Sequence, residues 1–246
     1  MLTRDELKRY DRQIMIRGIG EAGQEKLKKA RVVIAGSGGL GSPAAIYLAV
    51  AGIGTIRIID HDQVELSNLN RQILHWDRDI GKRKVDSSAE KLRQLNPHVK
   101  IEPVAETISQ GSIASLVAGF DAIVDAMDNL PTRFLLNKAA VDSGIPFFHG
   151  AVYGFEGRAM TVIPGKTACL KCLYRGLPPV EKFPVIGVTP AIIGCIQATE
   201  VIKYIAGIGE LLTDRILVYD GTDMKFTEFD VRRDPNCEHC GQAGRD

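Results

Sequence analysis

The chain has 246 residues, which suits one large α/β domain, and 45% of them are hydrophobic, enough for a sizeable core. Its 31 Lys and Arg residues balance its 30 Asp and Glu residues, so the net charge of about +1 gives no reason to expect a nucleic acid or an anionic membrane as partner. We expect a cytoplasmic protein, because the sequence has neither a run of about 18 apolar residues nor the apolar core of a signal peptide.

Strands alternate with helices through the first 151 residues. The first helix is predicted over 3–17, where Thr3 and Glu6 fit a capping box. Buried strands are predicted over 31–36, 55–60, 98–106, 120–129 and 145–151, and helices over 42–52, 81–97, 109–118 and 131–143. This alternation predicts an α/β fold with a Rossmann-like, doubly wound, mostly parallel sheet.

The pattern changes after residue 151. Strands are predicted over 157–163, 215–221 and 225–231, with one helix around 190–206 and a proline-rich loop over 176–187. Because crossover helices are otherwise absent from this part, we expect antiparallel strands that extend the sheet. We treat 1–246 as a single domain with an N-terminal helical arm (1–30), an alternating half (31–151) and an antiparallel extension (152–246).

A glycine-rich turn joins the first strand to the helix after it. Gly36, Gly38 and Gly41 form the pattern G-x-G-x-x-G, which allows a tight turn and brings anionic phosphate to a helix N-terminus. Asp60 ends the next strand 19 residues after Gly41, a spacing typical of a ribose ligand. A nucleotide site is therefore predicted, although these residues do not distinguish NAD from ATP.

Cations near this site favour a triphosphate. Arg71 closely follows Asp60, and Lys82, Arg83 and Lys84 are expected in the first turn of the next helix, where the helix dipole disfavours positive charge. A bound polyphosphate would offset that repulsion. The alternative is an ordinary solvated helix start, and charge alone does not choose among the three cations.

Two polar residues are expected where the strand 120–129 ends. Asp128 and Asn129 would then lie at the carboxyl edge of the sheet, where ligands of open α/β sheets bind. A carboxylate beside a triphosphate suits Mg²⁺. The alternative is a simple turn, since Asp-Asn is common in turns.

Four of the five cysteines form two CxxC pairs, Cys169/Cys172 and Cys237/Cys240. Two such pairs suit a closed tetrahedral zinc site with a structural role, because four cysteine ligands leave no position for water. We expect this site to attach the C-terminal tail to the rest of the protein. Cys195 lies among apolar residues of a predicted helix and is expected as a buried core thiol.

The histidines carry no predicted chemistry. His149 lies near the expected crevice and is given no role. His61, His75 and His98 are expected in turns or at the surface. His239, inside CEHC, is not needed as a metal ligand.

The motifs resemble those of the MoeB/ThiF/HesA family, relatives of ubiquitin-activating enzymes, most closely the MoeB type. The resemblance covers nearly the whole chain and is carried by RYDRQ (9–13), GSGGLGS (36–42), SNLNRQ (67–72), Gly-x-x-Lys (81–84), DAMDN (125–129) and the paired CxxC motifs. It implies a ThiF-type adenylation domain that uses ATP and Mg²⁺. The implied substrate is the C-terminal Gly-Gly carboxylate of a ubiquitin-like sulfur-carrier protein, which is converted to an acyl-adenylate.

The resemblance also implies roles for individual residues. Asp128 would order Mg²⁺, Arg71 and Lys84 would bind the triphosphate, and Arg12 would reach across a homodimer into the neighbouring active site; these four are the implied catalytic residues. The implied nucleotide contacts are Gly36, Gly38, Gly39, Gly41, Asp60, Asp62, Ser67, Asn68, Arg71, Gln72, Lys84, Asp128 and Asn129.

One departure from the family pattern bears on the chemistry. ThiF-type and ubiquitin-type members carry a cysteine in the crossover loop, and the corresponding segment 176–187 has none. No rhodanese-like sequence follows the last CxxC pair either. We therefore expect an enzyme that stops at the acyl-adenylate, which a separate sulfur donor then attacks.

Two other functions fit parts of the pattern. A NAD-dependent oxidoreductase is permitted by the glycine turn and Asp60, but no acid or base for hydride transfer stands out. A non-catalytic scaffold of the same fold is disfavoured because Arg12, Arg71, Lys84 and Asp128 are all present. Whether the carrier serves molybdopterin, thiamine, tRNA thiolation or protein conjugation is left open.

Overall fold

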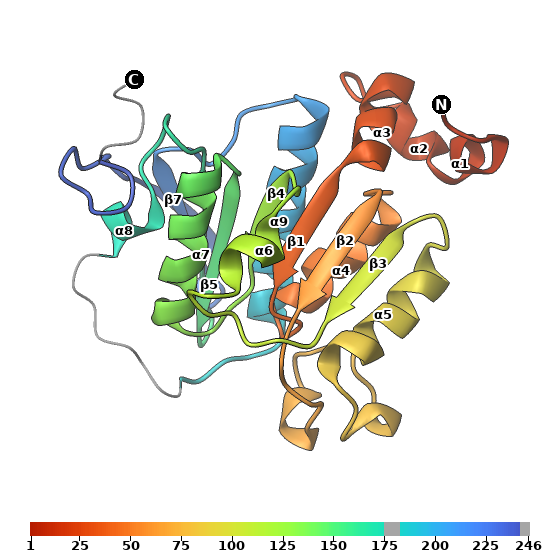
Figure 1. Cartoon of the computed structure of the whole chain (residues 1–246), viewed down its shortest axis with the longest axis horizontal. Coiled ribbons are helices and arrows are strands. Elements are labelled where there is room, and N and C mark those ends of the chain that lie inside the picture. The colour runs from red at the N-terminus through yellow and green to blue at the C-terminus, as the bar shows by residue number, and fades with distance from the viewer. Residues whose placement is uncertain (175–182, 242–246) are drawn as a thin grey trace.

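The computed structural model describes residues 1–174 and 183–241, and the strands in these ranges form one eight-stranded sheet (Figure 1). Its order is β3-β2-β1-β4-β5-β6-β7-β8. The strands are β1 (Arg31–Ala35), β2 (Thr55–Ile59), β3 (Lys100–Val104), β4 (Ala122–Asp125), β5 (Phe147–Tyr153), β6 (Glu156–Val162), β7 (Arg215–Asp220) and β8 (Lys225–Asp230). Strands β1 to β5 pair in parallel and β5 to β8 antiparallel, which confirms the predicted fold class.

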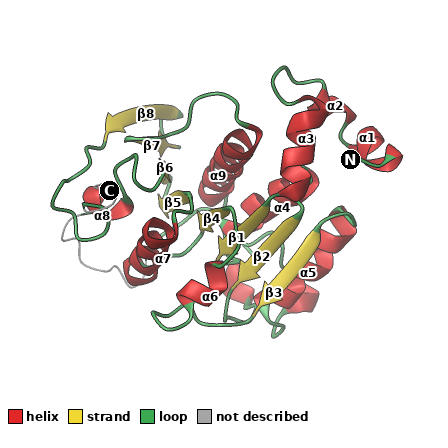
Figure 2. Ribbon diagram, turned by 45° about the horizontal axis from the view of Figure 1, so that its top comes forward, coloured by secondary structure: helices red, strands yellow, loops and turns green. Residues whose placement is uncertain are grey.

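Helices cover both faces of the parallel half of the sheet (Figure 2). Helices α4, α5 and α9 pack against one face, and α6 and α7 against the other. The helices are α1 (Arg4–Arg9), α2 (Asp11–Ile14), α3 (Gly20–Lys29), α4 (Gly41–Val50), α5 (Lys84–Leu95), α6 (Ile113–Val117), α7 (Leu130–Ser143), α8 (Leu170–Leu173) and α9 (Val188–Ala206). Across the described ranges, none of them combines the length and apolarity needed to cross a membrane.

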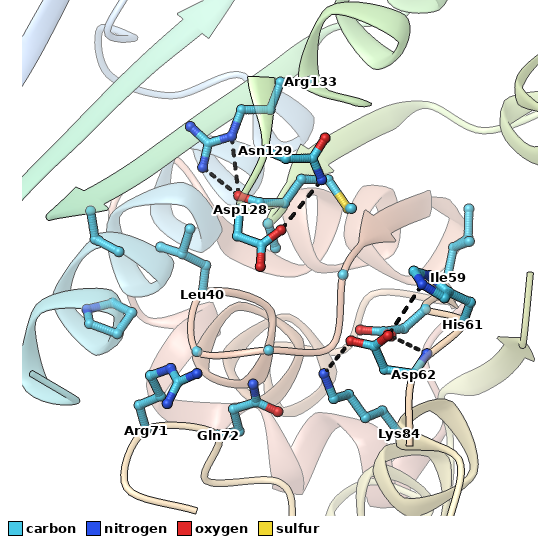
Figure 3. Close-up of a pocket in the computed structure, with 18 of the residues that line it drawn as sticks. Leu40, Ile59, His61, Asp62, Arg71, Gln72, Lys84, Asp128, Asn129 and Arg133 are labelled. Carbon is cyan, nitrogen blue, oxygen red and sulfur yellow. Dashed lines mark hydrogen bonds and ion pairs between the residues drawn. The ribbon is translucent and has the colours of Figure 1, made fainter. Parts of the chain in front are cut away.

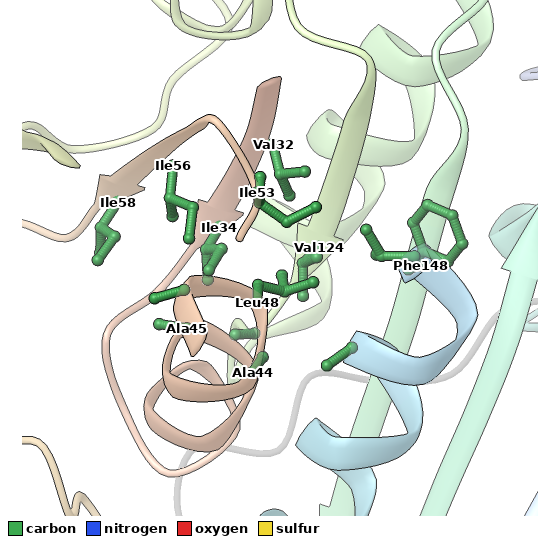
Figure 4. Packing of buried hydrophobic residues seen from close by; sticks show 14 of the residues in the cluster. Val32, Ile34, Ala44, Ala45, Leu48, Ile53, Ile56, Ile58, Val124 and Phe148 are labelled. Atoms are coloured by element: carbon green, nitrogen blue, oxygen red, sulfur yellow. The ribbon is translucent and has the colours of Figure 1, made fainter. Parts of the chain in front are cut away.

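The two-residue period of β1 divides the core into two layers. Val32 and Ile34 point toward α4, where they pack near Leu48 (Figure 4), while Val33 and Ala35 pack on the side of α6 and α7. These four side chains of β1 are fully buried. Burial of one such Val or Ile side chain contributes about 1.5–3 kcal/mol. Both faces of this central strand are covered, which explains why its sequence is a continuous apolar run.

The N-terminal arm corrects one prediction. The capping box of Thr3 and Glu6 is present, but the single helix predicted over 3–17 is wrong. The chain breaks into α1 and α2 at Tyr10, whose side chain is 4% exposed and whose hydroxyl accepts a hydrogen bond from Asn96 Nδ2 at 2.9 Å. Tyr10 is thus anchored in the core, and this tertiary contact interrupts the helix. The arm continues into α3, which the element predictions omit.

The strand predicted over 120–129 is too long. Strand β4 ends at Asp125, because the Asp125 carboxylate accepts a hydrogen bond from the Met127 backbone N–H at 3.1 Å and turns the chain. Asn129 then caps α7. Asp128 therefore lies in a turn beyond the carboxyl end of the strand and not on the strand itself.

The helix predicted over 81–97 begins later than expected. Lys84 is the first residue of α5 and Arg83 is its N-cap, so the placement of Lys82 and Arg83 within the first turn is wrong. Arg83 pairs instead with Asp86 at 2.6 Å on the protein surface. Only Lys84 of the three cations starts the helix.

Candidate active site

A crevice of about 260 Å³ opens at the carboxyl ends of β1, β2 and β4 (Figure 3). The turn after each strand contributes to it, as expected for a ligand site in an open α/β sheet. Ten of the residues implied as nucleotide contacts line it: Gly36, Gly38, Gly39, Asp60, Asp62, Arg71, Gln72, Lys84, Asp128 and Asn129. Segments that are distant in the sequence thus converge on one cavity.

The glycines of the loop between β1 and α4 serve different purposes. Gly36 has φ +103°, and a Cβ there would lie 2.6 Å from the Ala126 carbonyl oxygen. A Cβ on Gly41 would lie 2.0 Å from the Gly36 carbonyl oxygen, so Gly41 packs behind the loop and does not line the crevice. Gly38 and Gly39 do line it. The outer glycines allow the loop to form, and the inner ones expose its backbone to a ligand.

Asp60 links the glycine loop to the segment after β2. Its Oδ2 accepts from the Ser37 backbone N–H at 2.8 Å, and its Oδ1 accepts from the Asp62 backbone N–H at 2.9 Å. Each carboxylate oxygen has two lone pairs, so both oxygens can accept another hydrogen bond. Asp60 is therefore held in place and still able to receive ribose hydroxyls.

Lys84 supplies a buried positive charge at the start of α5. Its side chain is 7% exposed, and its Nζ donates to Asp62 Oδ2 at 2.7 Å. Asp62, half exposed, balances the charge that would otherwise oppose the helix dipole. An ammonium group has three N–H donors, so phosphate oxygens can bind Lys84 beside Asp62.

Arg71 and Gln72 form the wall opposite Asp128 (Figure 3). The Arg71 guanidinium is steadied by its own loop, since Nη1 donates to Ser67 O at 2.9 Å and to Asn70 Oδ1 at 2.8 Å. Gln72 is buried, and its Oε1 has no hydrogen-bond partner within 1–174 and 183–241. A buried acceptor left unpaired beside a cavity is costly, so it is a natural position for a donor group of a ligand.

Arg133 is a residue of the crevice that the sequence analysis missed. It lies in the first turns of α7, is buried, and lines the cavity beside Asp128. Its guanidinium donates to the Met127 carbonyl oxygen, at 3.1 Å from Nε and with a shorter contact from Nη2. A cation in the first turns of a helix that follows a strand is the signal that drew attention to Lys84, and it applies equally to Arg133.

Besides Gly41, three implied residues lie outside the crevice. Ser67 is exposed, and Asn68 is used by its own turn, where its Oδ1 accepts from the Glu65 backbone N–H at 3.0 Å. Arg12 is exposed on α2, whose neighbouring residue Gln13 donates to the Ala51 carbonyl oxygen just after α4. Helix α4 begins at the glycine loop and its 10 residues span about 15 Å, so Arg12 sits at the far end of this helix from the crevice.

The four CxxC cysteines come together, as predicted, at a separate place. All four Sγ atoms lie within 4.8 Å of one another. Three separations are 4.0 Å (Cys169–Cys172), 3.7 Å (Cys169–Cys237) and 3.5 Å (Cys172–Cys240). Tetrahedral Zn²⁺ with Zn–S bonds of about 2.3 Å requires separations of about 3.8 Å, so the cluster matches that geometry.

The cysteine cluster is attached to the same helix that begins at the crevice. Asn137 of α7 accepts from the Leu170 backbone N–H at 2.9 Å and donates from Nδ2 to His239 Nδ1 at 2.7 Å. His239 is therefore occupied in holding the loop, in line with the expectation that it is not a ligand. Burial raises the pKa of the Cys169 thiol to about 11, so a thiolate there requires a cation beside it.

The burial of two residues differs from expectation. His75 lies in a turn, where its backbone N–H donates to the Gln72 carbonyl oxygen at 2.9 Å, but it is not at the surface. It is 3% exposed, with Nε2 2.9 Å from the Ser37 carbonyl oxygen and Nδ1 3.0 Å from Ser87 Oγ. A carbonyl only accepts, so Nε2 carries the proton and His75 supports the glycine loop from below. Cys195 is half buried on α9 and not in the core, and burial raises the pKa of its thiol. His61 and His98 are exposed, as expected.

Acidification is expected to destabilise the fold through two buried histidines. Burial lowers the pKa of His75, as do Lys84 and Lys91, against the opposing effects of the Ser37 hydrogen bond and Asp60. Burial also lowers the pKa of His149. Both histidines are then neutral in the folded chain, whereas the unfolded chain binds protons as the pH falls below about 6.5.

Proton uptake on unfolding sets the direction in which stability changes with pH. Stability present above pH ~6.5 is lost as the pH falls toward the depressed folded pKa values, by up to about 1.4 kcal/mol per pH unit for each histidine. Denaturant unfolding at pH 7, 6 and 5 measures this slope. His75→Gln should flatten it and His98→Gln, at an exposed position, should not. A slope unaffected by His75→Gln would contradict the assignment.

Comparison with known proteins shows similarity along nearly the whole chain. Residues 10–239 match the model described as ThiF family. The chain is 44% identical over 251 residues to the SAMP-activating enzyme E1 of Haloferax volcanii, covering 100% of this chain and 93% of that protein. It is 39% identical over 250 residues to the sulfur carrier protein adenylyltransferase of Thermus thermophilus, covering 97% and 92%. Among solved structures, E. coli MccB with MccA-N7isoASN is similar with a TM-score of 0.86 and 27% identity, over 96% of this chain and 75% of that one.

Proposed function

The chain belongs to the ThiF family, and from this premise we propose that it is an ATP-dependent adenylyltransferase. Its substrate is the C-terminal Gly-Gly carboxylate of a ubiquitin-like sulfur-carrier protein. The Thermus thermophilus relative is named as an adenylyltransferase of a sulfur carrier protein, and MccB has also been solved with ATP. The observation that carries the proposal is the crevice itself, in which Arg71, Lys84 and Arg133 surround the space between the glycine loop and Asp128.

The reaction joins two anions. A carboxylate oxygen of the carrier attacks the α-phosphorus, and the bond from that phosphorus to the oxygen of the departing pyrophosphate breaks. A carboxylate is already a nucleophile, so no general base is needed. The protein must offset the repulsion between carboxylate and phosphate and stabilise charge on the phosphate oxygens. Lys84, Arg71 and Arg133 supply donors for this.

Asp128 is the residue we propose for Mg²⁺. It is exposed at the mouth of the crevice, and the hydrogen bond it receives from Asn129 Nδ2 is long, at 3.4 Å, so its oxygens remain available to a cation. Carboxylate and phosphate oxygens are the ligands that Mg²⁺ prefers. When bound there, the ion would neutralise part of the triphosphate charge.

The carrier tail has an entrance beside Asp128. A second cavity of about 140 Å³ shares Asp128, Arg133, Val152 and Phe183 with the crevice and is otherwise lined by Leu130, Ala151 and Tyr153. A Gly-Gly tail has no side chains and therefore needs little room beside these residues. Its carboxylate would meet the positive charge of Arg133 at the inner end.

The cysteine cluster is proposed to hold one structural zinc. Cys169, Cys172, Cys237 and Cys240 satisfy all four positions of a tetrahedral ion and leave none for a substrate. The ion would connect the segment around α8 to the C-terminal tail. It would take no part in the transfer of AMP.

The acyl-adenylate is proposed as the end product, to be attacked by a separate sulfur donor. The crossover loop 176–187 contains no cysteine, although 176–182 lie outside the described residues. Burial raises the pKa of Cys195, which keeps this thiol protonated and a poor nucleophile at neutral pH. Coordinated cysteines are equally unsuited to accept the acyl group.

The proposed function is tested by exchange of labelled pyrophosphate into ATP. Exchange should require both Mg²⁺ and a carrier that ends in Gly-Gly, and a carrier that lacks the last glycine should not support it. Non-reducing gels should reveal no thiol-sensitive adduct between enzyme and carrier. Binding of labelled NAD without binding of ATP would instead favour an oxidoreductase and refute the proposal.

We also propose a homodimer in which Arg12 acts on the partner's active site. Within one chain Arg12 sits at the opposite end of α4 from the crevice, so only another copy can bring it to the nucleotide. Mixing Arg12→Ala chains with Asp128→Ala chains, each inactive alone, should restore up to about half of the activity per dimer, because one of the two hybrid sites then carries neither substitution. Confirmed heterodimers without activity would exclude a shared site.

A further inference from the structure

His149 is fully buried in β5, and no step of the proposed reaction uses it. It lies directly opposite Asp125 on the adjacent parallel strand β4. Its Nδ1 is 2.7 Å from Asp125 Oδ2, and its Nε2 is 3.2 Å from the Tyr174 hydroxyl. Because both ring nitrogens are hydrogen-bonded, the imidazole is held in one orientation. It can therefore fix the position of the side chain to which it donates.

The direction of each hydrogen bond follows from its partners. Asp125 accepts from the Met127 N–H through Oδ1, and its Oδ2 lies 3.8 Å from Arg133 Nε, so the carboxylate is an acceptor on both sides. His149 must then donate from Nδ1. Burial lowers the pKa of His149, as do Arg133 and Arg158, although Asp125 opposes this. The ring is therefore neutral, and Nε2 accepts from the Tyr174 hydroxyl.

Asp125 and Arg133 together hold the turn that ends at Asp128. Asp125 accepts a hydrogen bond from the Met127 N–H. Arg133 donates to the Met127 carbonyl oxygen, along the dashed lines drawn from Arg133 in Figure 3. The peptide groups on both sides of Met127 are thus held by two buried, oppositely charged side chains. If Asp125 Oδ2 lost its donor, it would be drawn toward Arg133, which would then leave the Met127 carbonyl and release the turn.

We propose that His149 is a positioning residue: its Nδ1–H holds the Asp125 carboxylate, which keeps Arg133 on the Met127 carbonyl and Asp128 directed into the crevice. This inference rests on the proposed function. It adds that the orientation of Asp128 is set from the buried side of the sheet, by a residue that does not touch the nucleotide. Tyr174 contacts the other nitrogen and has no part in this alignment.

Two substitutions of His149 test the hydrogen bonds of its two ring nitrogens one at a time. In His149→Asn the amide can occupy the position of Nδ1 and still donate to Asp125. In His149→Gln the amide reaches the position of Nε2 and can bond Tyr174, while Asp125 Oδ2 loses the hydrogen bond that His149 donates. Each variant removes one buried hydrogen bond, so the two should lose similar stability in denaturant unfolding.

The two variants should nevertheless differ in function. His149→Asn should retain carrier-dependent pyrophosphate–ATP exchange within a few-fold of wild type. His149→Gln should lower kcat roughly 10–100-fold, with a smaller change in KM for ATP, and should need more Mg²⁺ for half-maximal exchange and for ATP binding. Tyr174→Phe leaves the hydrogen bond from His149 to Asp125 intact, so its exchange activity should be similar to that of His149→Asn.

The outcomes distinguish this inference from the function on which it rests. Equal losses in His149→Asn and His149→Gln, in proportion to their stability, would overturn the positioning role while wild-type exchange still supports adenylation. If wild type binds Mg-ATP but exchanges no pyrophosphate, the Mg²⁺ dependence of ATP binding still tests the contrast between the variants. A wild-type chain that binds no Mg-ATP would overturn both.

Discussion

Replacing Asp128 with alanine is expected to lower carrier-dependent pyrophosphate–ATP exchange by about 10²–10³-fold, the cost of losing one group that stabilises developing charge. Asp128 is exposed beyond β4, so the substitution removes a carboxylate without opening the core. The cations Arg71, Lys84 and Arg133 remain, and the nucleotide should still bind, but without the ligand that orders Mg²⁺. Exchange kinetics, together with a titration of ATP binding at several Mg²⁺ concentrations, measure the effect.

A matched control lies on the helix that follows. Asp142 is an exposed carboxylate of α7 that pairs with Lys138 on the surface, away from the crevice. Asp142→Ala should leave exchange at the wild-type level and cost a few tenths of a kcal/mol in stability. Asp128→Asn, which keeps the shape and removes the charge, should be nearly as impaired as Asp128→Ala. Full activity in Asp128→Asn would remove Asp128 from the proposed mechanism.

Replacing Cys172 with serine is expected to remove the zinc and to lower the free energy of unfolding by several kcal/mol. The tail after β8 carries Cys237 and Cys240, so loss of the ion would remove its connection to Cys169 and Cys172. Metal analysis of the purified protein should find about one zinc per chain in wild type and almost none in Cys172→Ser.

Cys195→Ser is the control for this second prediction, because Cys195 lies on α9 outside the cluster. It should keep one zinc per chain and near wild-type exchange. Treating wild type with a strong chelator should reproduce the instability of Cys172→Ser. A chain that carries no zinc and is as stable as the holoprotein would show that the cysteines pack without a metal.

Much of the fold could be predicted because its signals are local. The apolar run 31–36 and the glycine turn after it determine a strand followed by a helix, and both are found as β1 and α4. Alternation of such units predicts a parallel sheet. The loss of that alternation after residue 151 correctly predicts the antiparallel strands β6, β7 and β8.

Boundaries were less accurate because single side chains set them. Strand β4 stops at Asp125, whose carboxylate captures the Met127 N–H, although the apolar pattern continues beyond it. The first helix breaks at Tyr10, which is anchored to Asn96 about 86 residues away. Neither contact changes the hydrophobic periodicity of the sequence. Predictions from propensity alone therefore extend both elements too far.

The sequence by itself determined the alternating strands and helices, the glycine loop and the two CxxC pairs, because short spacings encode each of them. It also placed Arg71 and the cations at 82–84 near the loop, and the family resemblance selected Lys84 among them. Only the tertiary structure decided that Arg133 enters the crevice, that His75 supports the glycine loop, and that His149 meets Asp125. Burial and pairing of these side chains depend on which strands become neighbours. That arrangement brings together residues with no fixed spacing along the chain.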